Sequence, residues 1–397
     1  MCVLEASGRV GGRAHTSLRG LGVDLDRGCA WLHSAGHNPL RELADRHGIG
    51  YLGDPAMAYC IDGCWCDAAD NAAVTARWHE AGERIRRAGG QGGPATADAL
   101  LDTGAPHTPI HAYLLTAING VEPGEYATAE AAAEDDSHED WVVHDGLGRL
   151  VEQLATGLDI RRECPVRRIE QRDDAVAVVA DGVTVRARCA IVTVSTGVLG
   201  AGAIEFDPPL DAERRGALDA VPMGRAEKVA LRFRPDPFGL ADNTYVTIQR
   251  GEEAMGFHLL AGDDRLAVGY AGGELARFVA RADEPEVLEW ALGWLADGFG
   301  AGVREAFVRG TRTTWLDDPL VRGGYSAARP DGGHAQRGVL ARPHGERVLF
   351  AGEATSADRF ATVDGAWRSG ERAATEAWRL IEGQRGADTV KRPDPGD

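Results

Sequence analysis

Short apolar runs followed by glycine or a carboxylate recur at the start, in the middle and at the end of this chain. The clearest is Val348–Ala351, a run long enough for a buried strand, which ends on Gly352-Glu353. Glycine lets the backbone turn tightly there, and the glutamate presents a carboxylate at the carboxyl edge of the strand. A helical pattern then begins near Gly365. The sequence therefore predicts a strand, a turn and a helix in the stretch Val348–Ala374.

Small residues recur four apart along this predicted helix, in the two rows Gly365/Ser369/Ala373 and Ala366/Gly370/Ala374. Side chains four apart share a face, so one face of the helix is nearly bare. The bare face has two interpretations. It can pack closely against a sheet, or its first N–H groups can hold a flat, partly anionic group.

The first residues give a second site of the same kind. Met1–Ala6 is the tail of an apolar strand that ends on Glu5, and Gly11, Gly12 and Arg13 follow. In a dinucleotide fold a carboxylate at a strand end holds a ribose, and nearby glycines allow close approach to a pyrophosphate that an arginine can pair with. In that fold the first strand and its G-x-G-x-x-G turn precede the carboxylate by about 20–30 residues. Here we expect the chain to start at the second strand.

The middle of the chain alternates between β and α patterns. Trp141–Val143 predicts a strand and Gly146–Gly148 a turn into a helix, while Asp181-Gly182 marks a hairpin. The acidic run Glu130–Asp140 is most simply a solvated helix face or loop. Further strands are predicted at Lys228–Phe233, Thr244–Gln249, Gly256–Leu260 and Leu266–Tyr270.

These patterns predict an α/β (α+β) fold of two interleaved domains. A discontinuous Rossmann-like domain, truncated at its N-terminus, comprises residues 1–55, 141–222 and 338–383. An inserted mixed α/β domain for the substrate comprises residues 56–140 and 223–337, and residues 384–397 form a disordered tail.

Composition narrows the function classes. The chain has 397 residues and a net charge of −18, which disfavours a nucleic-acid partner. No apolar run approaches the ~20 residues of a membrane helix. Seven cysteines in a long chain favour reduced thiols and a cytoplasmic setting. Cys60, Cys64 and Cys66 lack a second cluster for a metal site and are interpreted as part of a hairpin around Asp62-Gly63, so no metal is expected.

Lysine is rare in this sequence. Only Lys228 and Lys391 are lysines among the 43 basic residues. Lys228 lies in mid-chain beside an apolar run, which favours a functional role over a surface lysine that snorkels from a strand edge.

The motifs together resemble the flavin-containing amine oxidases, which include monoamine and polyamine oxidases and the amine-oxidase type of histone lysine demethylase. The matching segments, in chain order, are Val3–Arg13, Asp26–His33, Asn38–Leu40, Trp141–Leu150, Ile191–Leu199, Pro222–Val229, Trp315–Pro319, Gly323–Ser326 and the stretch from Phe350 to Ala374.

The resemblance implies FAD as cofactor, at the junction of two domains. By matching position, Glu5 would bind the adenosine ribose, Arg13 with Gly11 and Gly12 the pyrophosphate region, and Val166 the adenine. At the other end of the cofactor, Gly352 and Glu353 would contact the ribityl–phosphate arm, and Thr362 and the Val363 N–H would meet the flavin.

The resemblance also implies the reacting residues. Lys228 matches the family's lysine, which holds a water at the reactive flavin nitrogen. Tyr325 matches one wall of the amine site, with Trp315 nearby, and His33, Trp31 and Thr362 are candidate substrate contacts. Gly324 stands where monoamine oxidases carry a flavin-linking cysteine, so FAD should be non-covalent. The V-H-G-A-Y of the family reads Val363-Asp364-Gly365-Ala366-Trp367 here.

We therefore expect an FAD-dependent amine oxidase that moves a hydride from a small-molecule amine, which could be a polyamine, to flavin N5. Dioxygen would be the acceptor, and an imine or aldehyde and hydrogen peroxide the products. Two alternatives stay open. The chain could be an inactive or misassigned fragment that does not hold FAD, or a related FAD-dependent dehydrogenase or desaturase. The sequence does not indicate the oligomeric state.

Overall fold

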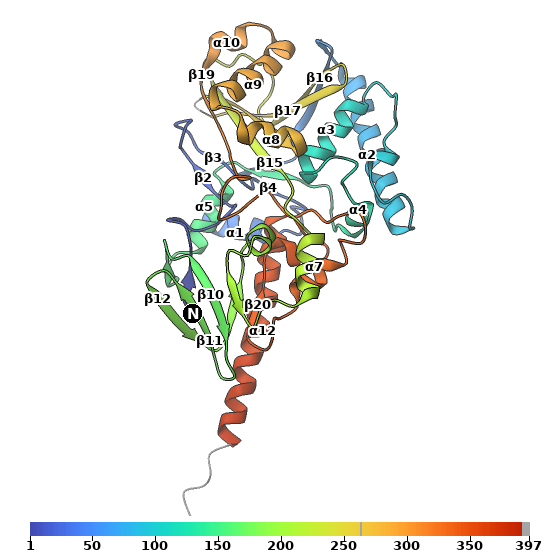
Figure 1. Cartoon of the computed structure of the whole chain (residues 1–397). Helices are drawn as coiled ribbons and strands as arrows, with labels where there is room; N and C mark the ends of the chain where they lie inside the picture. The colour runs from blue at the N-terminus through green and yellow to red at the C-terminus, as the bar shows by residue number, and fades with distance from the viewer. Residues whose placement is uncertain (263, 391–397) are drawn as a thin grey trace, which may run out of the picture.

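The computed structural model describes residues 1–262 and 264–390. They form two stacked lobes (Figure 1). One lobe contains a seven-stranded sheet in the order β19-β15-β18-β17-β16-β6-β7. Its strands come only from the two segments that the sequence assigned to the substrate domain: β6 Ala56–Ile61, β7 Cys64–Trp65, β15 Ala226–Phe233, β16 Thr244–Arg250, β17 Glu253–Leu260, β18 Arg265–Gly272 and β19 Phe307–Arg312.

Helices cover this sheet and complete its core. They are α2 (Ala68–Gly90), α3 (Thr108–Asn119), α8 (Gly273–Arg281), α9 (Glu284–Phe299) and α10 (Gly302–Ala306) (Figure 1). Alternate residues of each strand point to opposite faces. Val229, Leu231 and Phe257 therefore point away from the other lobe into a core that includes Leu295 of α9, and all four are fully buried.

The other lobe holds the predicted nucleotide-binding segments. Its largest sheet has the order β12-β11-β10-β14. Two hairpins occur where the sequence predicted them, at Asp62-Gly63 between β6 and β7 and at Asp181-Gly182 between β11 and β12, and both glycines have positive φ. The four strands are β10 Val166–Gln171, β11 Val176–Ala180, β12 Val183–Ala187 and β14 Glu205–Asp207.

Two parallel strand pairs also belong to this lobe. β1 (Val3–Leu4) pairs with β9 (Ile160–Arg161), and β13 (Ala190–Val192) pairs with β20 (Val348–Phe350). Among the described residues the two pairs are separate sheets and share no strand. β20 is nevertheless fully enclosed, with Val348, Leu349 and Phe350 at most 2% exposed.

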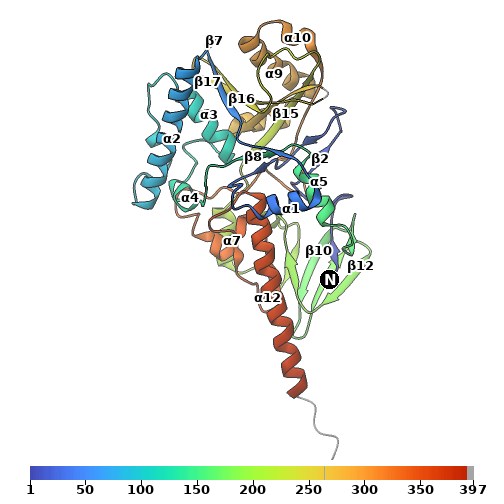
Figure 2. The ribbon, with the colours of Figure 1, turned by 180° about the vertical axis from the view of Figure 1, so that it is seen from behind.

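The helix α12 (Val363–Val390) begins at the junction of the lobes and runs out of the body of the protein (Figures 1 and 2). We expected the chain from residue 384 onward to be disordered, but α12 continues to Val390. Extending an existing helix adds one hydrogen bond for each residue fixed, so no new nucleus is needed. Residues 391–397 of the predicted tail lie outside the described residues.

The remaining elements are short. The helices are α1 Pro39–His47, α4 Thr128–Ala133, α5 Leu147–Leu154, α6 Thr196–Gly200, α7 Ala212–Ala220 and α11 Gln336–Ala341, with 3₁₀ turns at Asp98–Leu100 and Glu353–Thr355. The strands are β2 Thr16–Ser17, β3 Leu25–Asp26, β4 Trp31–Leu32, β5 Tyr51–Leu52 and β8 Trp141–Val143.

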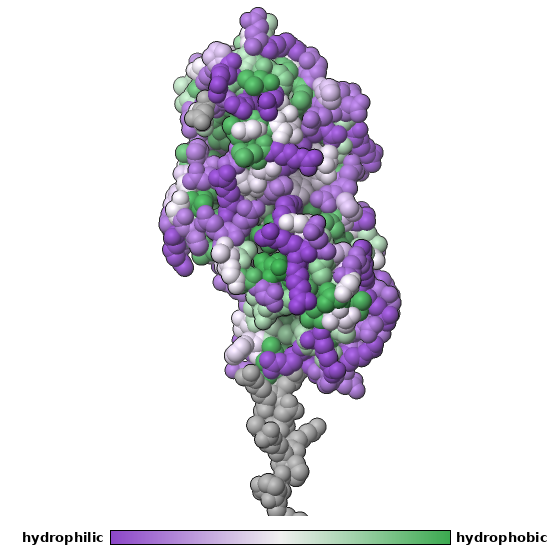
Figure 3. Space-filling model, turned by 90° about the vertical axis from the view of Figure 1, so that its left-hand side faces the viewer, coloured by the Kyte–Doolittle hydropathy of each residue, from purple (hydrophilic) through white to green (hydrophobic). Residues whose placement is uncertain are grey.

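The surface is mixed in polarity. On the face in Figure 3, apolar residues form patches on both lobes that polar residues separate. In the part of the chain that the structure describes, no helix is long and apolar enough to cross a membrane.

Candidate active site

Four side chains from adjacent strands share the face of the seven-stranded sheet that turns towards the other lobe. Lys228 on β15 is paired with Tyr270 on β18. Val268, two residues from Tyr270 and hence on the same face, is paired with His258 on β17, which is paired in turn with Tyr245 on β16. The register of the sheet therefore places a lysine, two tyrosines and a histidine on one face, in two adjacent cross-strand rows.

Lys228 is bound by main-chain carbonyl groups. Its Nζ donates to the oxygens of Asp26 at 2.9 Å and Gly28 at 2.6 Å, and it lies 5.1 Å from the centre of the Tyr270 ring. The residue is 8% exposed. Burial lowers the pKa of Lys228 to about 8, although the nearby Asp26 carboxylate opposes this shift. The lysine is thus a buried amine that can change protonation state near neutral pH.

Trp315 is held beside Lys228 by the same segment. Its Nε1 donates to the oxygen of Arg27 at 2.9 Å, so three consecutive carbonyls, from Asp26 to Gly28, hold the two residues together. A side chain at Gly28 would stand 1.7 Å from the carbonyl oxygen of Arg13, so only glycine fits there. The structure therefore brings together Lys228 and Trp315, two of the residues that the resemblance named as catalytic.

The carboxylate of Asp26 fixes the position of this segment. It accepts hydrogen bonds from the N–H groups of Leu147 at 2.8 Å and Gly148 at 3.2 Å, at the start of α5, and from Thr16 Oγ1 at 2.5 Å. A carboxylate at a helix N-terminus satisfies N–H groups that have no partner within the helix. Burial raises the pKa of Asp26, and these hydrogen bonds oppose the rise.

Further aromatic side chains lie against this face of the sheet near His258 and Tyr270. Trp31 stacks on His258 with 4.9 Å between ring centres and donates from Nε1 to the Tyr270 hydroxyl at 3.2 Å. Tyr325 donates its hydroxyl hydrogen to the oxygen of Ala117 at 3.0 Å. Burial lowers the pKa of His258 to about 3, so the imidazole stays neutral beside Lys228.

The residues expected at the adenosine end lie together in the other lobe. Glu5 follows β1, and its carbonyl oxygen accepts the N–H of Cys164 at 2.8 Å, two residues before Val166. Its carboxylate accepts the N–H of Ser7 at 2.8 Å. Gly11 and Gly12, with φ of 96° and 57°, form the turn that leads to Arg13.

Arg13 connects this end to the end of β20. Its Nη1 lies 2.8 Å from Glu353 Oε1 and donates to the oxygen of Gly324 at 2.9 Å. Gly352 has a φ of 128°, which favours glycine and aims Glu353 inward. Glu353 also accepts from the Ser326 hydroxyl at 2.6 Å. Burial raises the pKa of Glu353, but Arg13 and Arg337 outweigh it and leave the pKa below the usual value.

The start of α12 matches both interpretations of its bare face. Thr362 caps the helix, since its Oγ1 accepts the N–H of Gly365 at 3.1 Å, and the N–H of Val363 has no partner within the helix. In one row of small residues, Ser369 binds the N–H of Gly352 at 2.9 Å. In the other row, a Cβ at Gly370 would meet no atom within 4 Å. One row packs on β20, and the other faces open space.

The acidic run that we expected to be solvated is partly buried. Glu130 is 2% exposed, with Oε1 2.6 Å from Nη2 of Arg337, which is itself 1% exposed. Burial raises the pKa of Glu134 to about 7, and the nearby carboxylate of Asp136 raises it further. The prediction of a solvated face was wrong for Glu130, because its cationic partner lies 207 residues away in the sequence.

His33 lies beside this acidic segment. Its Nδ1 is 2.7 Å from Asp140 Oδ1. Burial lowers the pKa of His33, but the hydrogen bond and the charge of Asp140 outweigh burial and set it at about 9. His33 is therefore a cation already paired with a carboxylate.

Asp364 stands where the family motif has histidine, and the structure shows its contacts. Its Oδ2 lies 3.2 Å from Nη1 of Arg359, whose Nη2 lies 2.5 Å from Asp135 of the acidic segment. Asp364 is 1% exposed. This residue therefore ties the loop before α12 to the first turn of the helix.

Sequence reasoning missed several residues of the site. Tyr270, His258 and Tyr245 lie in strands whose alternation was visible, but which face lay towards the other lobe was not. Glu227, Glu130 and Arg337 are buried charges whose partners are distant in the sequence. Period-2 alternation from Lys228 to Phe233 was the one signal that could have assigned the Lys228 face.

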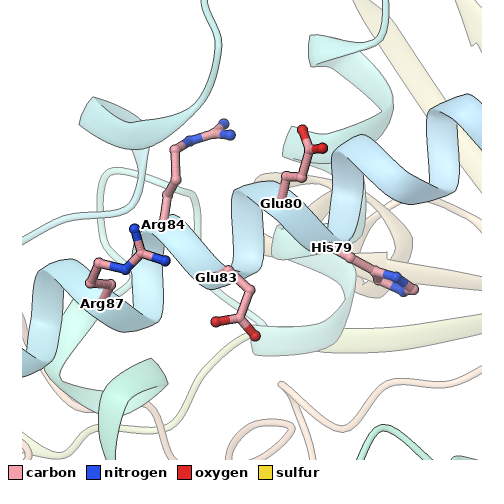
Figure 4. Close-up of a pocket in the computed structure, with 5 residues that line it drawn as sticks. All are labelled: His79, Glu80, Glu83, Arg84 and Arg87. Carbon is pink, nitrogen blue, oxygen red and sulfur yellow. The ribbon is translucent and has the colours of Figure 1, made fainter.

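A separate surface depression does not belong to this site. It lies along α2, and Figure 4 shows the five charged or polar residues that line it, all from that helix: His79, Glu80, Glu83, Arg84 and Arg87. These side chains form a solvated helix face.

The sequence of the chain matches the model of one known protein family over most of its length. The family model described as "Flavin containing amine oxidoreductase" matches residues 2–61 and 112–377. This chain belongs to that family.

Individual relatives agree with the family. The chain is 28% identical over 431 residues to polyamine oxidase 4 of Oryza sativa subsp. japonica, covering 97% of this chain and 85% of that protein. It is 31% identical over 242 residues to lysine-specific histone demethylase 1B of Mus musculus, covering 58% of this chain and 29% of the demethylase. The chain thus spans about a third of the length of the demethylases that it matches.

Solved structures share the fold. Cyclohexylamine oxidase from Brevibacterium oxydans IH-35A superposes with a TM-score of 0.80 and 20% identity, covering 96% of this chain and 94% of that one. A redesigned putrescine oxidase gives a TM-score of 0.78 and 20% identity, covering 96% and 93%.

The residues present fit a flavin adenine dinucleotide. The open row beside Gly370 and the free N–H of Val363 can face a flat group with an anionic edge. Glu5 offers a carboxylate to a ribose. Arg13 binds Glu353 and Gly324 through Nη1 and could offer its remaining N–H donors to a pyrophosphate.

The burial of Lys228 predicts a pH-dependent stability. Its pKa is about 8 in the folded protein and 10.5 ordinarily. Between these values the unfolded chain binds more protons, so the free energy of unfolding rises with pH. Below the folded pKa the charged lysine costs about 3 kcal/mol. As the pH rises through this window, the free energy of unfolding should rise by about 3 kcal/mol in the wild type but stay level in Lys228→Met. Denaturant unfolding at several pH values measures the difference.

The matched control is Lys391→Met, which removes the only other lysine of the sequence. Its stability should follow the wild-type pH dependence. Parallel curves for wild type and Lys228→Met would contradict the burial of the ammonium group.

Proposed function

We propose that this protein is an FAD-dependent amine oxidase that uses dioxygen and releases hydrogen peroxide. The observation that carries the proposal is the buried pair Lys228 and Trp315, held together by the consecutive carbonyls of Asp26, Arg27 and Gly28. FAD, bound non-covalently as Gly324 in place of cysteine indicates, would accept the hydride from the carbon beside the amine nitrogen.

The side chains of this protein would bind and orient the amine. Trp31, Tyr270 and Tyr325 offer aromatic surface to an amine, which favours the faces of aromatic rings when charged. His258 stays neutral beside them and so adds no like charge. Lys228, with its lowered pKa, can hold a water molecule and move a proton at Nζ. Holding the donor carbon and the acceptor in line supplies much of the rate gain.

The decisive experiment is purification of the full chain after expression with riboflavin, followed by a visible absorption spectrum and an oxygen-electrode assay with a panel of amines. Bound flavin and amine-dependent oxygen consumption with peroxide release would support the proposal. A colourless protein that is also inert after incubation with FAD would overturn it.

The substrate class that we infer is a polyamine or diamine. The region beside His33 and Trp31 carries Glu134, Asp136 and Asp140, and their mutual repulsion helps to raise the pKa of Glu134 to about 7 after burial. A second ammonium group of a substrate would relieve this repulsion. The similarity to a polyamine oxidase over most of the chain supports the same class.

This inference gives a prediction about specificity. Glu134→Gln should raise the KM for a diamine about tenfold while leaving the KM of a monoamine of equal length unchanged, because only the diamine carries a distant ammonium group. Steady-state oxygen consumption with both substrates measures the effect. Glu139→Gln is the matched control, because Glu139 belongs to the same acidic segment but its carboxylate already accepts a hydrogen bond from the Ser137 hydroxyl at 3.2 Å. Equal changes for both substrates would contradict a distal binding role.

A second candidate function has one observation in its favour. Among the described residues the pairs β1–β9 and β13–β20 share no strand, and no G-x-G-x-x-G turn follows a strand in a suitable place. This arrangement favours a chain that does not retain FAD. A related FAD-dependent dehydrogenase or desaturase is the remaining alternative. The flavin spectrum separates the first from the proposal, and peroxide release separates the second.

A further inference from the structure

Glu227 is a buried carboxylate next to the candidate catalytic lysine. It is 2% exposed and adjoins Lys228 on β15. Neighbouring residues of a strand point to opposite faces, so the carboxylate lies behind the sheet face that carries the lysine. Among the described residues, no lysine, arginine or histidine nitrogen lies within 4.0 Å of it, in contrast to the buried Glu130 and Glu353.

The partners of Glu227 all belong to the turn that carries Trp315. The Leu316 N–H donates to Oε1 at 2.8 Å, and the Thr313 hydroxyl donates to Oε2. Burial raises the pKa of Glu227, whereas the bonds from Thr313 and Leu316 lower it. The carboxylate thus accepts one donor from this turn at each of its two oxygens.

The same turn is attached to the strand on its other side. The Lys228 N–H donates to Thr313 Oγ1 at 2.7 Å, and the Thr313 N–H donates to the oxygen of Lys228 at 2.9 Å. Beyond the turn, the oxygen of Trp315 accepts the N–H of Gly323 at 3.0 Å, two residues before Tyr325. Hydrogen bonds therefore connect Glu227, through the turn 313–316, to the segment that carries Trp315 and to the residues just before Tyr325.

We propose that Glu227 is a positioning residue, which holds the turn 313–316 so that the Trp315 indole stays against the Arg27 carbonyl beside Lys228. The expected effect on the reaction rate rests on the proposed amine oxidation. The expected effect on the position of the indole rests on the geometry alone. Without the carboxylate, the N–H of Leu316 and the hydroxyl of Thr313 lose their acceptor and the turn relaxes. The indole then leaves the place that Lys228 shares with it.

The test combines ¹⁹F NMR with steady-state kinetics. The full-length protein is labelled with 5-fluorotryptophan, and Trp315→Phe assigns the Trp315 resonance. Glu227→Ala should shift or broaden that resonance while the remaining tryptophan resonances keep their positions. Its kcat should fall about tenfold with KM changed less than twofold, because the reacting geometry is lost while the aromatic contacts to the amine remain.

Two further variants keep the proposal falsifiable if Glu227→Ala does not fold. Glu227→Gln retains one acceptor oxygen and should move the resonance and kcat less than Ala does; Thr313→Val removes the hydroxyl and should move both as Ala does. Asp317→Asn is the matched control, since it removes an exposed charge from the same loop and should change neither.

Unchanged Trp315 resonances in Glu227→Gln and Thr313→Val would overturn the inference, as would equal shifts of all tryptophan resonances, which mark a general structural role. If the wild type oxidises no amine, the proposed function fails, and the resonance alone still decides the role of Glu227.

Discussion

Replacing Lys228 with methionine should slow amine-dependent oxygen consumption by at least about a hundredfold, the range that a lost proton-transfer group costs. Methionine has nearly the shape of lysine but cannot donate to the oxygens of Asp26 and Gly28, which lie 2.9 and 2.6 Å from Nζ in the wild type. We expect the variant to keep the fold and to lose the cation that lies 5.1 Å from the centre of the Tyr270 ring.

The measurement should separate the two halves of the reaction. Anaerobic mixing with amine reports hydride removal from the substrate, and mixing of the reduced protein with dioxygen reports reoxidation. We expect the loss chiefly in the second, because the proposed function assigns Lys228 and a water molecule bound to it to that half. Lys391→Met serves as control and should retain wild-type rates. An unchanged rate of reoxidation in Lys228→Met would refute the role of this lysine.

Replacing Arg337 with methionine should lower the free energy of unfolding by about 3–5 kcal/mol, the cost of leaving buried charges unpaired. Arg337 is 1% exposed and binds Glu130 at 2.6 Å and the Ser326 hydroxyl at 2.7 Å, and Ser326 in turn donates to Glu353. Without the arginine, the carboxylate of Glu130 is buried without its cationic partner. The Ser326 hydroxyl, which donates to Glu353, also loses its hydrogen bond from Arg337.

Denaturant unfolding of three variants measures this effect. The double variant Arg337→Met/Glu130→Leu should recover a large part of the loss, because no charge is then left buried without a partner at that position. Arg186→Ala, which removes an exposed ion pair with Asp174, should leave stability nearly unchanged. A single variant as stable as the wild type would contradict the buried pairing.

The parts of the site that local patterns encode were predictable from the sequence. The run that ends at Gly352-Glu353 is β20 followed by a turn with positive φ, and Lys228 lies on an alternating strand as expected. These features depend on neighbours in the sequence, where the periods of strand and helix are visible. The scarcity of lysine added a signal that does not depend on structure.

The parts that depend on distant partners were not predictable. Glu130 opens an acidic run of the composition expected for a solvated face, and only the fold brings Arg337 to it. Glu227 was indistinguishable from a surface glutamate until the turn 313–316 was placed against it. The composition also did not predict that α12 extends to Val390, because glycines at 383 and 386 disfavour a helix.

The carbonyl groups that hold Lys228 and Trp315 have a consequence for how this site tolerates mutation over evolutionary time. A main-chain acceptor is encoded by the path of the backbone and survives a change of side chain at Arg27, whose carbonyl holds the Trp315 indole. A substitution at that position would instead remove the side-chain hydrogen bond from Arg27 Nη2 to the oxygen of Arg312 at 2.6 Å, so its cost lies outside the bond to the indole. In a saturation-mutagenesis map, position 228 should stand out as intolerant, because the two carbonyls of Asp26 and Gly28 accept from its ammonium group.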